Sequence, residues 1–274
     1  MNSLEAAMRV LKLLDKRRPV LRVGEISREL SLQKSTVSRL LRTLNEHEFL
    51  ERERDGQGYT VGRRSLVLSD LYLVGHSLLS RIDAVLDALV DEFGFVGYAG
   101  VLSGADIVVL RLKYGRYPLR FVQDVGQRIP AERTAIGRAL LARNQNAEAI
   151  ALIGQHSRTR AARATLLEEL ARIRRKGWAA IESAIIPGIA AVGAAVGDPA
   201  RNEAMGFALS FPMTATDELL RERMARTVRD EARRLGEHLG DPFWADIRAS
   251  GEIDVVQTSR TGQRRARKPQ RATA

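Results

Sequence analysis

The residues best suited to chemistry in this sequence stand in one short stretch with helical spacing. Residues 34–46 place four leucine and valine side chains on one helical face, which predicts an amphipathic helix whose other face is polar and basic. Such side chains bind phosphate oxygens and the edges of DNA bases. The predicted DNA-binding residues are Gln33, Lys34, Ser35, Thr36, Ser38, Arg39, Arg42, Arg52 and Arg54.

The segments around this helix predict a winged helix-turn-helix. A short helix over Ile26–Leu30 precedes it, and Ser31–Gln33 forms a polar break between the two. After it, Phe49–Arg54 and Tyr59–Val61 predict two strands joined by Asp55-Gly56-Gln57-Gly58, which is a strong hairpin signal. In this arrangement the second helix buries its apolar face and enters the major groove with its polar face.

Composition is compatible with a polyanionic partner. The chain has 274 residues, 44 Lys+Arg against 33 Asp+Glu, and a formal net charge of +11. It contains no cysteine, which excludes disulfides, cysteine-bound metals and thiol chemistry. The start lacks the apolar core of a signal peptide, and no stretch approaches the roughly 20 apolar residues of a membrane span. We therefore expect a soluble, cytoplasmic protein without a membrane partner.

The sequence offers no catalytic apparatus. The histidines His47, His76, His156 and His238 stand far apart, and none belongs to a metal-binding spacing. There is no GxSxG, Walker or GxGxxG motif. We expect no catalytic residue, no metal and no cofactor, and hence no enzyme. The alternative is an enzyme or small-molecule-binding protein that uses its N-terminal domain only for assembly.

Outside the helix-turn-helix, the sequence predicts a first helix from Ser3, its N-cap, to Leu14, and one long helix from Ser65 to about Phe93. The leucine stripe of the long helix can pack within the chain or against a second copy, and the pattern leaves both open. The rest predicts an α+β domain. Its expected strands are 96–102, 107–114, 119–122, 178–181, 189–196 and 205–211, its helices 134–142, 148–153, 165–176 and 214–239, and 126–133 is a loop.

Several motifs, in this order and spacing, make the chain resemble the IclR family of bacterial transcriptional regulators over residues 3–240. The matching pieces are Ser3-Leu4-Glu5-Ala6, the run from Leu32 to Leu41, Tyr59-Thr60-Val61-Gly62, Pro118-Leu119-Arg120, Val125-Gly126-Gln127-Arg128-Ile129-Pro130, the run from Thr134 to Ala142, and Arg174-Arg175-Lys176-Gly177-Trp178. The resemblance implies a winged helix-turn-helix, a linker helix and a GAF-like effector-binding domain with an antiparallel sheet. We expect a DNA-binding domain over 1–62, a linker helix over 63–93 and an effector-binding domain over 94–248. The loss of aromatic residues and the accumulation of arginines near the end predict a disordered basic tail over 249–274.

The resemblance also implies a homodimer or homotetramer, acting as repressor or activator on palindromic double-stranded DNA operators and responding to a small organic molecule. By position, the family's effector site maps onto Ala135, Ile136, Ile181, Ile189, Ala191, Ala208 and Ser210. The sequence departs from the family pattern at Glu132, where histidine is common, and at Ala191, where several relatives have cysteine. Ile181 and Ala208 also replace polar residues found in members that sense carboxylates.

The expected effector is an aromatic or medium-chain organic acid. Its apolar body suits the mapped isoleucines, while small side chains at Ala191 and Ala208 leave room for it. Free N–H groups at the start of the helix near Thr134 can hold its carboxylate. Thr134 can instead cap this helix and occupy some of those donors.

Overall fold

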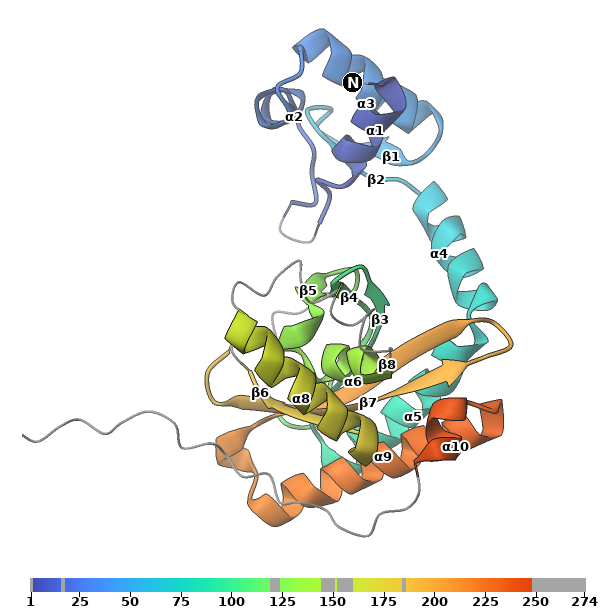
Figure 1. Cartoon of the computed structure of the whole chain (residues 1–274). Helices are drawn as coiled ribbons and strands as arrows, with labels where there is room; N and C mark the ends of the chain where they lie inside the picture. The colour runs from blue at the N-terminus through green and yellow to red at the C-terminus, as the bar shows by residue number, and fades with distance from the viewer. Residues whose placement is uncertain are drawn as a thin grey trace, which may run out of the picture. The chain divides into compact units, whose positions relative to one another are not determined.

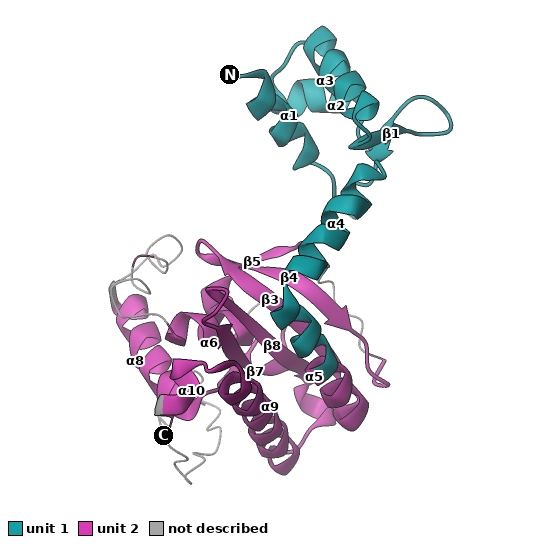
Figure 2. Ribbon diagram, turned by 90° about the vertical axis from the view of Figure 1, so that its right-hand side faces the viewer, with its two compact units in different colours: residues 1–84, 122–124 teal, residues 85–121, 125–274 magenta. Residues whose placement is uncertain are grey.

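The computed structural model describes residues 2–15, 18–118, 124–143, 151, 160–183 and 186–247. The chain forms two compact units, residues 1–84 with 122–124 and residues 85–121 with 125–274 (Figure 2). The predicted strand 119–122, the helix 148–153 apart from residue 151, and the basic tail 249–274 lie outside the described residues. The domain boundaries at 62 and 93 stay a prediction.

The first unit contains the predicted winged helix-turn-helix. Asn2, and not Ser3, caps the first helix, because its side chain accepts a hydrogen bond from the N–H of Leu4 at 3.1 Å. The wing strands pair antiparallel, and Leu21 adds a single bridge to Tyr59. The elements are α1 (Ser3–Leu11), α2 (Val23–Leu30), α3 (Lys34–Glu46), β1 (Leu50–Arg52), β2 (Tyr59–Val61) and α4 (Arg64–Gly75).

One apolar cluster holds this unit together and fixes the turn before α3. Ser31 ends α2 in the left-handed conformation, and the Ser27 hydroxyl donates to the Leu32 carbonyl at 2.6 Å. The cluster joins all three helices to the wing. It contains Ala6, Val10, Leu21, Ile26, Leu30, Val37, Leu40, Leu41, Leu44, Leu50 and Tyr59.

The prediction of one continuous linker helix is wrong. The segment forms two helices, α4 and α5 (Ser77–Phe93), separated at His76, whose φ of −111° and ψ of 77° are not helical. In α5 the stripe residues Leu78 and Ile82 are buried within one chain. In α4 no residue is buried. The α5 half of the predicted leucine stripe is therefore covered by the same chain, whereas the α4 half is exposed.

The second unit is built on a six-stranded antiparallel sheet with the order β5-β4-β3-β8-β7-β6. The predicted loop 126–133 contains the short edge strand β5 and a 3₁₀ turn, and the short helix α10 was also not predicted. The strands are β3 (Val96–Ser103), β4 (Asp106–Lys113), β5 (Arg128–Pro130), β6 (Ala179–Glu182), β7 (Ile189–Asp198) and β8 (Glu203–Pro212). The helices are η1 (Ala131–Arg133), α6 (Ala135–Arg143), α8 (Arg160–Lys176), η2 (Met213–Ala215), α9 (Glu218–Leu239) and α10 (Pro242–Asp246).

Helices cover both faces of this sheet (Figure 1). α6 and α8 lie on one face, and α9 with the end of α5 lies on the other. A Cβ atom on Gly206 would stand 2.6 Å from the Ile136 side chain, and one on Gly97 would stand 2.7 Å from Val90. Glycine therefore allows a helix to approach each face closely.

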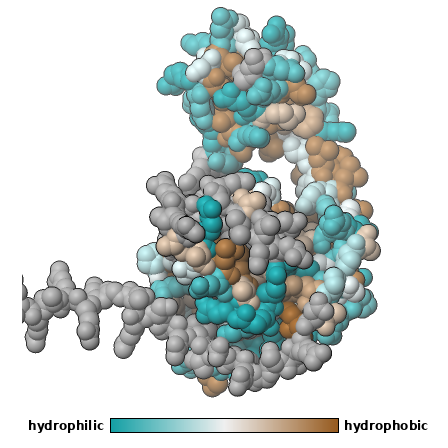
Figure 3. Space-filling model, in the orientation of Figure 1, coloured by the Kyte–Doolittle hydropathy of each residue, from teal (hydrophilic) through white to brown (hydrophobic). Residues whose placement is uncertain are grey.

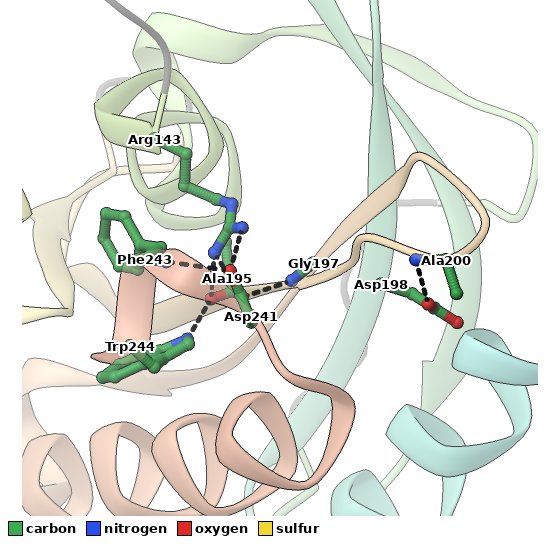
Figure 4. Close-up of polar contacts among 8 residues, drawn as sticks. All are labelled: Arg143, Ala195, Gly197, Asp198, Ala200, Asp241, Phe243 and Trp244. Carbon is green, nitrogen blue, oxygen red and sulfur yellow. Dashed lines mark hydrogen bonds and ion pairs between the residues drawn. The ribbon is translucent and has the colours of Figure 1, made fainter. Parts of the chain in front are cut away.

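A buried ion pair ties the end of α6 to the C-terminal segment (Figure 4). Arg143 donates two hydrogen bonds to the Asp241 carboxylate, at 2.7 and 2.8 Å. Asp241 also accepts from the N–H groups of Gly197 at 2.7 Å and Phe243 at 3.1 Å. The Asp241 side chain is 0% exposed and that of Arg143 is 13% exposed, so each charge depends on the other.

Trp244 completes this junction. Its indole N–H donates to the Ala195 carbonyl of β7 at 3.0 Å. Its ring fills space that a side chain at Gly177 or Gly236 would occupy, because a Cβ there would lie 2.7 and 2.3 Å from ring atoms. The small helix α10 thus locks the ends of α8 and α9 against β7.

We predict that Asp241→Ala destabilises the second unit by about 3–5 kcal/mol, because it leaves the Arg143 guanidinium buried without its counter-charge. The control is Asp198→Ala, which removes a carboxylate that accepts from the turn N–H of Ala200. Urea unfolding followed by tryptophan fluorescence reports this unit, since Trp178 and Trp244 are the two tryptophans of the chain. Equal losses in the two variants would contradict the prediction.

Candidate nucleic-acid interface and effector site

The predicted DNA-binding residues gather on α3 and the wing. Along α3 the apolar side chains Val37, Leu40 and Leu41 are buried, which turns the polar side chains outward. Thr36 is half-buried, and the other predicted residues are exposed: Gln33, Lys34, Ser35, Ser38, Arg39, Arg42, Arg52 and Arg54. The exposed N-terminal half of α3 therefore presents hydroxyls and cations together, as a major-groove helix requires.

Two of the wing and helix cations have partners that hold their side chains. The Arg52 guanidinium lies 5.4 Å from the centre of the Tyr59 ring, across the β1–β2 pair. Arg42 lies 3.7 Å from Glu46, one turn further along α3, in an exposed pair that water screens strongly. Arg54 precedes the tight wing turn, where Gly56 has a φ of 72°.

The first turn of α4 is fastened to the DNA-binding motif at Glu48. The carbonyl of Glu48 accepts from the Arg64 N–H at 3.0 Å, and its carboxylate is hydrogen-bonded to the Arg63 guanidinium. This hydrogen bond lowers the pKa of Glu48. A Cβ on Gly62 would lie 2.2 Å from the Glu48 carbonyl oxygen, so glycine is required for the contact.

The residues mapped as an effector site lie on one face of the sheet and on α6. Ala191 is paired with Ser210 and with Ile181 across neighbouring strands, so the three side chains point to the same side. Ile189 lies two residues before Ala191 on β7 and shares that side. Ala208 is opposite Gly193, where a Cβ would meet the Ala135 side chain of α6 at 3.3 Å.

One of the N–H donors at the start of α6 already has an acceptor within the chain. The Thr134 hydroxyl accepts a hydrogen bond from the Gly137 N–H at 2.9 Å, which is the capping alternative that the sequence left open. The 3₁₀ turn η1 also folds close over this end, since a Cβ on Gly137 would lie 2.1 Å from the Ala131 carbonyl oxygen. The N–H of Gly137 is therefore not available to a carboxylate, and the expected carboxylate site is left with the N–H groups of Ala135 and Ile136.

Tyr98 lies on the same face and was missed by sequence reasoning. It is paired with Ala208 across β3 and β8, and Ser210 lies two residues further along β8 on the same side of the sheet. Burial raises the pKa of this phenol, so it keeps its proton at neutral pH. A tyrosine at an inward strand position is the signal that could have identified it, because a buried hydroxyl needs a partner.

The residues that the structure describes form no helix that is both long and apolar enough to cross a membrane. They contain no cluster of three acidic or histidine side chains that could hold a metal ion.

Comparison with known families identifies the class. Residues 3–54 match the "IclR helix-turn-helix domain", and residues 70–237 match "Bacterial transcriptional regulator IclR C-terminal". The chain belongs to the IclR family of bacterial transcriptional regulators. This confirms the predicted family and fold class.

Individual relatives agree with this assignment. The chain is 29% identical to the glycerol operon regulatory protein of Streptomyces griseus over 244 residues, which cover 87% of this chain and 96% of the relative. It is 29% identical to the transcriptional regulator XynR of Escherichia coli over 65% of this chain and 73% of the relative. The structure of an IclR homologue of Microbacterium hydrocarbonoxydans in complex with 4-hydroxybenzoate superposes with a TM-score of 0.74 at 19% sequence identity. The superposition covers 87% of this chain and 99% of the homologue. These relatives are regulators and not enzymes, as predicted.

We predict that Arg39→Ala and Ser38→Ala each weaken operator binding by about 1–3 kcal/mol and relax its sequence preference. Both side chains are exposed on the face of α3 opposite its buried leucines. Arg233→Ala, on α9 of the other unit, removes the same charge from outside the winged helix-turn-helix and should leave discrimination intact. Binding isotherms on specific and scrambled duplexes measure the effect, and unchanged discrimination in both α3 variants would mean that the recognition helix is misassigned.

Proposed function

We propose that this regulator binds palindromic double-stranded DNA operators as a dimer or tetramer, through α3 and the wing, and that a small organic acid changes its affinity for them. The observation that supports this most directly is the outward row of hydroxyl and cationic side chains on α3, within a chain of known regulatory family. Such a function places the protein in the cytoplasm with the chromosome.

Self-association is supported by the exposed surface of α4. Its apolar side chains point almost all round the helix, and Leu66, Leu71 and Val74 are 73%, 62% and 75% exposed. Figure 3 shows the hydrophobic side chains gathered along this helix. A helix that is apolar on all sides is stable when another surface covers it, and a second copy of α4 supplies a matching one.

We predict that Leu71→Lys combined with Val74→Lys yields monomers. The two side chains are exposed in one chain, so the charges oppose association without disturbing a core. Leu78 and Ile82, in contrast, are buried, and charges there would unfold the chain. The control is Ser80→Lys on the exposed side of α5. Sedimentation at micromolar concentration measures the state, and a wild-type monomer there would contradict the proposal.

The proposed effector is an aromatic or medium-chain organic acid. The mapped residues form an apolar layer between the sheet and α6, in which Ala135, Ile136, Ala191 and Ala208 belong to one buried cluster with Ile181 packed against it. Apolar walls favour an apolar body over an acid of two or three carbons.

We predict that Ala191→Trp abolishes the response to acids by filling this layer, while DNA binding persists. Ala190→Trp is the matched control, because the neighbouring residue of β7 points to the opposite face. Thermal shifts and release of a bound duplex would compare benzoates and phenylpropanoids with glyoxylate and pyruvate. If the smallest acids alone act, or if Ala191→Trp responds like wild type, the site assignment is wrong.

A further inference from the structure

The helix α4 is capped by residues that lie outside it. Among the described residues, its N-cap Arg63 makes no side-chain hydrogen bond that would cap the helix. Two early N–H groups instead find acceptors in the segment that follows α3. The Arg63 N–H donates to the Glu51 carboxylate at 3.2 Å, and the Arg64 N–H donates to the Glu48 carbonyl at 3.0 Å. The winged motif therefore caps the helix that leaves it.

Glu48 adopts a backbone conformation that is unusual for a glutamate. Its φ is 63°, in the left-handed region that favours glycine. Glu48 directly follows His47, which ends α3, and the next residue, Phe49, donates its N–H to the Leu44 carbonyl at 2.9 Å. Glycine is the usual residue at such a helix end, so a glutamate there indicates a role for its side chain.

The Glu48 side chain holds the short connection between the wing and α4. Only Gly62 and Arg63 separate β2 from α4. The Gly62 N–H donates to the Phe49 carbonyl at 2.9 Å, and the Arg63 guanidinium is hydrogen-bonded to the Glu48 carboxylate. This hydrogen bond lowers the pKa of Glu48, so the carboxylate is charged at neutral pH. We call Glu48, Glu51, Gly62 and Arg63 the α4 joint.

We propose that Glu48 is a positioning residue for operator binding, which sets the direction in which α4 leaves the winged motif and thereby the spacing of the two half-sites that a dimer binds. This rests on the proposed function, in which α4 contacts its copy in a second chain. In such a dimer, the direction of each α4 at its joint places the two winged motifs.

Half-site spacing is a sensitive measure of this direction. One additional base pair moves a half-site by about 3.4 Å and turns it by about 35° around the DNA axis. A joint that holds α4 in one direction therefore favours one spacing, and a loosened joint tolerates several.

The Glu48–Arg63 pair is suited to set a direction without supporting the fold. The two side chains are 46% and 70% exposed, so their ion pair contributes little to stability. Because just two residues connect β2 to α4, a contact beside this connection narrows the range of angles that α4 can adopt. Loss of the pair should leave the winged motif folded, which allows positioning to be measured apart from stability.

The test measures binding of the full-length protein to three duplexes. The first is a palindromic duplex that wild type selects from a random-sequence pool, and the others have a spacer one base pair shorter or longer. We expect wild type to prefer the selected spacing by about tenfold or more, and Glu48→Gly by about threefold or less. Glycine suits a φ of 63°, so this variant removes the carboxylate without straining the backbone.

A reversed pair separates the carboxylate from the flexibility of glycine. Glu48→Arg alone places two cations side by side and should lose the spacing preference. Glu48→Arg combined with Arg63→Glu restores an ion pair and should recover it. The control is Glu29→Ala, which removes the acceptor of Arg18 in another exposed pair of the same unit, at 2.6 Å, and should keep the preference.

Thermal unfolding followed by circular dichroism should give Glu48→Gly the wild-type temperature or a higher one. Equal losses of affinity on all three duplexes, an unchanged preference, or a reversed pair that fails to recover it would overturn this inference and leave the proposed function standing. A wild type that binds the three spacings alike would do the same. A wild type that selects no palindromic duplex would overturn the proposed function and this inference with it.

Discussion

The architecture of the second unit depends on how closely the backbone of α6 approaches β7 and β8. Gly193 and Gly206 lie beneath the first residues of the helix: a Cβ on Gly206 would stand 2.6 Å from the Ile136 side chain, and one on Gly193 would stand 3.3 Å from Ala135 and 2.9 Å from Ala208. Interiors pack at crystal-like density, so this approach fixes the depth of the layer between helix and sheet. The side chains that remain in that layer are small, apart from Tyr98 and a few isoleucines and leucines.

The two ends of α6 are fixed by different means. At its start, Thr134 supplies a capping hydroxyl and the turn η1 folds over the first residues. At its end, Arg143 is paired with Asp241, and the Arg174 side chain donates to the Ala142 carbonyl at 2.6 Å. Because both of its ends are fixed, α6 is held in one position against the sheet, and it forms one side of the buried layer between helix and sheet.

Most of the fold could be predicted from the sequence, because local patterns determine it. The spacing of Val37, Leu40 and Leu41 predicts α3, and runs rich in small and β-branched residues predict the long strands β7 and β8. The prediction missed β5 and α10, since three to five residues carry too little periodicity. It also missed the break at His76, because the leucine stripe continues in phase on either side of it.

The candidate sites also differ in whether their residues stand close together in the sequence. The proposed DNA-binding face could be outlined from the sequence because its residues lie within about three turns of one helix and the adjoining wing. Arg143 and Asp241 stand 98 positions apart in the sequence, and Tyr98 pairs with Ala208 from a similarly distant strand, so only the folded structure brings these residues together. The local spacing of residue types along the sequence contains no signal for contacts between such distant positions.

The fastening of α4 at Glu48 has a mechanical consequence. Since the Arg64 N–H and the Arg63 side chain are both held by that residue, α4 cannot change direction without carrying the winged motif with it. Twelve residues at 1.5 Å each give a lever of about 18 Å. A rotation of about ten degrees at His76 would displace the far end of the lever by about 3 Å, close to the rise of one base pair. A small angular change at one residue would thus become a shift of the winged motif by about one base-pair step.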